Sequence, residues 1–121
     1  MYKLAKKLLK QIENAGFLVS RDEDDGSYTF QKYSPEGQDF FFEISGKTKD
    51  EFIRNIVEYY EGYDVSYEAY IWLDKWGHGK NGAPYDMKDV YEDMETCREY
   101  IWELYEIVVG GQSTIKEAVN V

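Results

Sequence analysis

Residues 17–45 read FLVSRDEDDGSYTFQKYSPEGQDFFFEIS, a stretch of alternating polar and apolar positions that turn residues interrupt twice. Asp25-Gly26 is typical of a tight hairpin turn, and Ser34-Pro35-Glu36-Gly37 suits a type I turn with proline at its second position. We therefore expect three strands, at residues 17–21, 27–33 and 38–45. Two tight turns between three strands predict an antiparallel three-stranded meander.

Helical periodicity precedes the meander. Leu4, Leu8 and Ile12 fall on one stripe of a helix that we expect over residues 2–15. Gly16 suits the left-handed position that ends such a helix.

Three further helices are expected after the meander. A capping box at Thr48-Lys49-Asp50-Glu51 predicts a helix over residues 48–62. A short helix should follow over residues 64–74, and the longest helix should run from residue 86 to residue 108. We expect the short helix to pack through three apolar side chains, Tyr67, Tyr70 and Ile71.

The expected order is α-β-β-β-α-α-α, an α+β fold that forms one domain over residues 1–121. Within it, residues 110–121 are expected to be a loosely packed tail or a short docked helix. Residues 1–62 follow the element order of the double-stranded-RNA-binding domain, which the chain resembles in that order alone. This segment holds nine basic and twelve acidic residues, a net charge of −3, so we do not expect it to bind RNA.

The overall charge argues against several classes of function. The chain carries 24 acidic and 14 basic residues, a formal net charge of −10. Nucleic acids and anionic membranes both require a basic surface, so neither is expected as a direct partner. One cysteine and one histidine exclude an internal disulfide and a His/Cys zinc site. We find no signal peptide and no long apolar run, and we expect a cytoplasmic protein.

The longest predicted helix carries carboxylates along one side. Its apolar side is formed by Met87, Val90, Met94, Cys97, Ile101, Leu104, Tyr105 and Val108. Separations of three and four residues place five glutamates on the opposite side: Glu92, Glu95, Glu99, Glu103 and Glu106. We call these five residues the acidic row, and we expect Asp89 and Asp93 to widen it. The row extends for about 21 Å at a rise of about 1.5 Å per residue.

Two interpretations of the acidic row remain open. Like charges at this spacing repel one another, so the acidic row lowers the stability of the helix. In one interpretation the row only aids solubility, and in the other it is a functional surface. If the row is a functional surface, its charge spacing along the helix axis, about 4–5 Å per carboxylate, approaches the phosphate spacing of a DNA strand, about 3.4 Å. Tyr100 and Trp102 lie beside the row, where they either contact a partner or pack against the preceding helix or the tail.

In size, charge and the glutamates between Glu92 and Glu106, the chain resembles small acidic DNA-mimic inhibitors of phages and mobile elements, of the anti-CRISPR and antirestriction type. The resemblance implies a non-enzymatic protein that blocks the basic groove of a host nuclease, such as a CRISPR effector. The implied partner is thus a nucleic-acid-processing enzyme with a basic surface. The expected contact residues are Asp89, Glu92, Glu95, Glu99, Glu103 and Glu106.

The glycine-rich loop over residues 76–85 is a second candidate site. It brings His78 and Lys80 together, and a small enzyme or ligand-binding module would need a pocket there with converging tyrosine hydroxyls. Residues 77–82 match the letters of G-x-G-x-x-G, but a helix is expected before them instead of a strand, so a dinucleotide is not expected. We assign no catalytic residues, metal or cofactor. A third alternative is a structural domain that forms oligomers through an aromatic patch.

Two other charged segments have simpler interpretations. Asp22-Glu23-Asp24-Asp25 suggests calcium ligation, but Arg21 and Lys32 stand where an EF-hand loop needs oxygen ligands, so we expect an acidic hairpin tip. The first helix carries four lysines that either compensate the acidic remainder of the chain or bind a membrane surface, which the overall charge opposes: Lys3, Lys6, Lys7 and Lys10.

Overall fold

The structure, a computed structural model, describes residues 1–110. Its elements are α1 (Lys6–Asn14), β1 (Leu18–Arg21), β2 (Tyr28–Tyr33), β3 (Asp39–Ile44), α2 (Lys49–Gly62), α3 (Val65–Tyr70) and α4 (Met87–Gly110). The predicted α+β order is therefore confirmed. Of the tail expected at residues 110–121, only Gly110 is described, as the last residue of α4, and the rest lies outside the described residues.

The three strands form an antiparallel sheet in the order β1-β2-β3. Phe30 at its centre lies opposite Val19 on one side and Phe42 on the other. Because side chains alternate along a strand, one face of the sheet is buried and carries Tyr28, Phe30, Phe42 and Ile44. Gly26 and Gly37 have φ values of +77° and +86°, which glycine adopts without strain, so both predicted turns close the meander.

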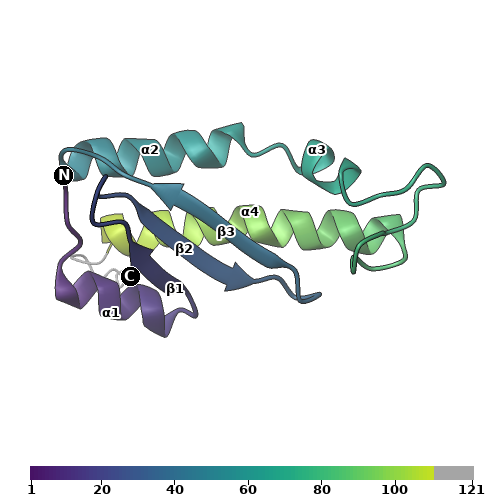
Figure 1. Cartoon of the computed structure of the whole chain (residues 1–121), viewed down its shortest axis with the longest axis horizontal. Coiled ribbons are helices and arrows are strands. Elements are labelled where there is room, and N and C mark those ends of the chain that lie inside the picture. The colour runs from purple at the N-terminus through teal and green to yellow at the C-terminus, as the bar shows by residue number, and fades with distance from the viewer. Residues whose placement is uncertain (111–121) are drawn as a thin grey trace, which may run out of the picture.

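The helices flank and back the sheet. Figure 1 shows α4 running behind the strands and extending past them toward α3, with α2 on one side of the sheet and α1 on the other. The predicted apolar side of α4 is confirmed by six buried residues, Val90, Met94, Cys97, Ile101, Leu104 and Val108. Met87 was expected there too, but it is 46% exposed because it opens the helix beside the preceding loop.

The sequence predicted the end of α1 correctly but not its start. Gly16 follows α1 with a φ of +105°, as predicted, but α1 begins at Lys6 and not at residue 2. The residues before Lys6 use their backbone N–H groups in other hydrogen bonds. Tyr2 donates to the carbonyl of Gly46, and Leu4 donates to the hydroxyl of Tyr28. Residues that satisfy their backbone donors elsewhere have no need of a helical turn.

The Thr48 capping box is confirmed at the start of α2. The Thr48 hydroxyl accepts a hydrogen bond from the backbone N–H of Glu51 at 3.1 Å. The carboxylate of Glu51 accepts in return from the N–H of Lys47, one residue before the usual position.

The prediction for α3 was wrong in length and in packing. The helix ends at Tyr70 and not at Asp74. Its fully buried residue is Ala69, whereas the three side chains expected to pack are largely exposed: Tyr67 at 61%, Tyr70 at 71% and Ile71 at 43%. The helix ends early because the following backbone folds into a loop around Asp74, which accepts from the N–H groups of Trp76 and His78.

Candidate functional site

The acidic row lies on a single continuous helix. α4 contains 24 residues, a length of about 36 Å, and packs through the side opposite the row. Four of the five glutamates are exposed: Glu92, Glu95, Glu99 and Glu106. The helix is therefore a straight support that presents these carboxylates to solvent.

Glu103 is the member of the row that the rest of the chain neutralises. Lys32 on β2 places its ammonium nitrogen 2.8 Å from a carboxylate oxygen of Glu103 and donates to the carbonyl of Ala15, also at 2.8 Å. The same nitrogen lies 4.4 Å from the ring centroid of Tyr100 and 5.0 Å from that of Phe17. One carboxylate of the acidic row, that of Glu103, is therefore paired with a lysine of the protein itself.

Glu92 has a weaker partner. Its carboxylate lies 3.6 Å from the ammonium of Lys88, one turn earlier, and both side chains are exposed. Exposed pairs of this kind contribute little and are readily exchanged for a partner's charge. Within residues 1–110, Glu95, Glu99 and Glu106 form no ion pair, and they are spaced about 6 Å and 10 Å apart along the helix axis. Unpaired charge along α4 is therefore sparser than on a DNA strand.

Asp93 does not widen the row, contrary to the expectation from the sequence. It is 2% exposed and accepts hydrogen bonds from the Ser34 hydroxyl at 2.6 Å and from the Glu36 N–H at 3.0 Å. These bonds fasten the β2–β3 turn to α4 and bring the exposed residue Glu36 alongside the helix. Asp89, the other residue expected to widen the row, is partly buried.

The aromatic residues beside the row pack within the protein. Trp102 contacts the Tyr60 ring of α2 at 4.9 Å and the Tyr105 ring at 4.4 Å, so it packs within the protein, but on α2 instead of α3, the helix that directly precedes α4. Arg98 lies 3.9 Å from the Tyr60 ring and donates to the Tyr60 carbonyl. Tyr100 donates its hydroxyl to the carbonyl of Tyr33 and packs on the strands.

The four lysines expected on the first helix, of which Lys3 precedes α1 in the structure, stay separate from the acidic row. In the part of the chain that the structure describes, none of their ammonium groups lies within ion-pair distance of a carboxylate: Lys3, Lys6, Lys7 and Lys10. Direct ion pairs therefore do not compensate these lysines, and the row is not covered by them.

The loop over residues 76–85 is organised around Asp74 and Tyr85. Hydrogen bonds from the backbone of His78, and then from Trp76, hold the pKa of Asp74 below its ordinary value. The His78 ring stacks on the Tyr85 ring at 4.1 Å, and the Tyr85 hydroxyl lies 3.1 Å from His78 Nε2. A pocket beside the loop is lined by Lys80 but not by His78. The structure thus pairs His78 with Tyr85 and does not bring it into a pocket with Lys80.

The acidic hairpin tip is held by its own carboxylates. Asp22 accepts from the backbone N–H groups of Asp24 and Asp25, and Asp25 accepts from Ser27. These bonds account for the acidic residues as turn-stabilising groups. Over residues 1–110, no three Asp, Glu, His or Cys side chains gather closely enough to hold a metal ion.

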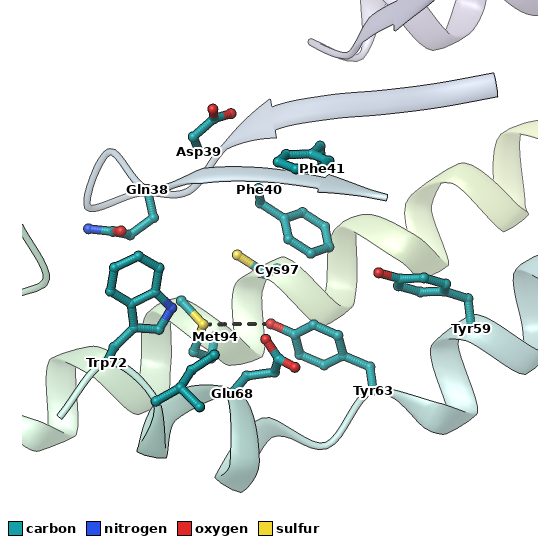
Figure 2. A pocket seen from close by; sticks show the side chains of 11 residues that line it. Gln38, Asp39, Phe40, Phe41, Tyr59, Tyr63, Glu68, Trp72, Met94 and Cys97 are labelled. Atoms are coloured by element: carbon teal, nitrogen blue, oxygen red, sulfur yellow. Dashed lines mark hydrogen bonds between the residues drawn. The ribbon is translucent and has the colours of Figure 1, made fainter. Parts of the chain in front are cut away.

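Sequence reasoning missed a pocket between β3, α2, α3 and α4. Figure 2 shows Glu68 and Tyr63 turned toward one space, with the Trp72 ring at its side. Tyr63, Glu68 and Trp72 are close in the sequence, but the opposite wall comes from β3 and α4, so no local pattern in the sequence marks the pocket.

Neither the helices nor the comparisons assign the protein to a known class. No helix among residues 1–110 combines the length and the apolar character needed to cross a membrane. In comparisons with known proteins, no family model, no curated protein and no solved structure matches this chain.

Proposed function

We propose that this protein is a non-enzymatic binding or inhibitory protein that presents the outer side of α4 to a basic protein surface. The surface that fits this role best is the nucleic-acid groove of a nuclease, such as a CRISPR effector, which the protein would occupy as a nucleic-acid mimic. The observation that carries the proposal is the exposure of Glu92, Glu95, Glu99 and Glu106 on one continuous helix.

The arrangement of the charges supports a contact surface more than a solubilising coat. Glu95 and Glu99 lie one turn apart and repel each other in the free protein, and a basic partner would relieve that repulsion. Because α4 is already folded and packed, presenting these carboxylates costs little backbone conformational entropy on binding. The sparse spacing of the unpaired charges means that Glu36 and the exchangeable Glu92 must contribute if a nucleic-acid strand is to be imitated.

Affinity capture from a host lysate tests this proposal. The immobilised protein should retain a nucleic-acid-processing enzyme at low salt and release it at high salt, because contacts between exposed charges are screened. A variant with Glu95, Glu99 and Glu106 changed to lysine should retain none of it. A control variant with Glu13, Asp24 and Glu61 changed to lysine alters the net charge equally and should behave as wild type. Capture of the same enzyme by both variants would refute the proposal.

The exposed aromatic end of the molecule favours a second candidate, self-association. Tyr67, Tyr70, Ile71, Trp76, Tyr85 and Met87 are each at least 43% exposed. They belong to α3, the following loop and the start of α4, which gather at the end of the molecule away from the N-terminus (Figure 1). Exposed tyrosine and tryptophan are typical of interfaces. Sedimentation equilibrium should then show a dimer that Tyr70→Ser with Trp76→Ser dissociates, and a monomeric wild type would exclude this candidate.

A further inference from the structure

The pocket between the sheet and the helices has walls of two chemical kinds. Phe40 of β3, Tyr63 after α2 and Trp72 after α3 contribute aromatic rings, and Glu68 of α3 contributes a carboxylate. Figure 2 shows the carboxylate of Glu68 beside the Tyr63 hydroxyl, with the Trp72 ring to the side of both. The pocket holds about 210 Å³. A cavity of about 150 Å³ already binds benzene, so a small organic group fits here.

Glu68 is the charged group of this pocket without a partner. Over residues 1–110, its carboxylate makes no ion pair and no hydrogen bond, although it is partly buried. Partial burial, and after it the charge of Asp64, raises the pKa of this carboxyl. Asp39, the other acid of the pocket, instead accepts a hydrogen bond from Gln31.

The charge of Glu68 reaches the other polar groups of the pocket. Burial is the main reason why the pKa of Tyr63 lies far above its ordinary value and why that of Cys97 is raised to about 12, and Glu68 adds to both. Both groups are therefore neutral at physiological pH. None of the residues lining the pocket is basic, so the negative charge of Glu68 is uncompensated there.

We propose that this pocket is a binding site for an alkylammonium group, which the carboxylate of Glu68 pairs with while the rings of Phe40, Tyr63 and Trp72 surround the cation and its alkyl part. Aromatic rings attract organic cations through their negative faces, and a partly desolvated carboxylate adds a charge-assisted hydrogen bond. A metal ion would need several oxygen ligands, and Glu68 supplies the one free carboxylate among the residues lining the pocket.

The site is independent of the acidic row. Met94 and Cys97 line the pocket from the buried side of α4, opposite the exposed glutamates. Because the two surfaces are separate, this proposal can be refuted without affecting the function proposed for α4. The alkylammonium group has two sources, a free amine or a lysine side chain of another protein.

The test is an NMR titration of the full chain with n-butylammonium and with n-butanol, a neutral molecule of similar shape. We expect saturable shifts of the Trp72 indole and of the pocket amides with n-butylammonium, and binding at least about tenfold weaker with n-butanol. Glu68→Gln should weaken n-butylammonium binding by about tenfold, whereas Glu61→Gln, at an exposed acid of α2, should leave it unchanged. Equal binding of the two molecules, no binding, or no effect of Glu68→Gln would overturn the proposal.

A second variant and a second pair of probes complete the test. Trp72→Leu keeps an apolar wall but removes a ring, and it should weaken n-butylammonium binding by about threefold even if Glu68→Gln does not fold. The peptide acetyl-Gly-Lys-Gly-amide and its norleucine counterpart represent the protein source. Once n-butylammonium binding is established, tighter binding of the lysine peptide than of n-butylammonium identifies a protein lysine as the source, and weaker binding identifies a free amine.

Discussion

Lys32 connects three parts of the chain through one ammonium group. It pairs with Glu103, donates to the carbonyl of Ala15 and lies over the ring of Tyr100. Lys32→Met keeps much of the side-chain volume but leaves Glu103 without its cation and Ala15 without its donor. We expect the free energy of unfolding to fall by about 1–3 kcal/mol, measured by urea denaturation. Glu103→Gln should cost less, because its amide oxygen still accepts from Lys32. Equal stability of Lys32→Met and wild type would show that this contact contributes nothing.

Asp93 and Glu95 are two acids of α4 with different roles. Asp93 is buried and accepts from Ser34 and Glu36, whereas Glu95 is exposed. Asp93→Ala leaves both donors unpaired, so it should lower the free energy of unfolding by about 1–3 kcal/mol. Glu95→Ala should change it by less than about 0.5 kcal/mol. Thermal unfolding of the two variants measures both changes. Similar losses of unfolding free energy in both would contradict the assignment of Asp93 as structural.

Glu68 should lower stability at neutral pH. Since its pKa is raised in the folded protein, its favourable contribution belongs to the protonated form and is lost as pH rises through that raised pKa. Glu68→Gln should therefore stabilise the protein at pH 7, by up to about 0.5 kcal/mol once solvent screening is allowed for. The gain should vanish below the ordinary glutamate pKa, about 4.3. Urea denaturation at both pH values measures this, and a loss of stability at pH 7 would contradict it.

At the level of the element, α4 contains repulsion that a single change can remove. Glu99 lies four residues from Glu95, so Glu99→Lys replaces this repulsive pair with an attractive one, whereas Glu103 is already paired with Lys32. We expect the helix to gain about 0.2–0.5 kcal/mol from this pair and the melting temperature to rise or stay level. Circular dichroism measures the melting temperature, and a clear fall would mean that Glu99 has a structural contact in solution. An unchanged or raised melting temperature would also show that charge reversal on α4 leaves the fold intact, so that its effect on binding can be interpreted directly.

Elements whose signals are local could be predicted from the sequence. The meander, the Thr48 cap and the buried side of α4 each depend on residues within one segment. The packing of α3 could not be predicted, because the choice between Tyr70 outside and Ala69 inside depends on where α4 lies.

At the scale of the whole molecule, the site residues that sequence reasoning misjudged are those joined over long separations. Asp93 binds Ser34 across 59 positions, and Glu103 binds Lys32 across 71 positions. The helical spacing of the acids was read correctly, but spacing alone does not show which carboxylate the remainder of the chain captures. The pocket around Glu68 has the same origin, since four elements meet to form it.

Residues 1–110 present three separate surfaces at which another molecule could bind. The exposed glutamates lie along the outer side of α4, the aromatic side chains lie at the α3 end, and the pocket opens between β3 and the helices. A basic partner that binds along α4 therefore leaves the aromatic end and the pocket free, so variants of each surface can be interpreted separately.

The most direct measurement is the salt dependence of affinity for the captured partner, compared between wild type and the Glu95, Glu99 and Glu106 lysine variant. Binding to wild type should weaken steeply as salt increases, and the lysine variant should lose binding while the Glu13, Asp24 and Glu61 control retains it. A lysine variant that binds with wild-type affinity and the same salt dependence would show that α4 is not the contact surface.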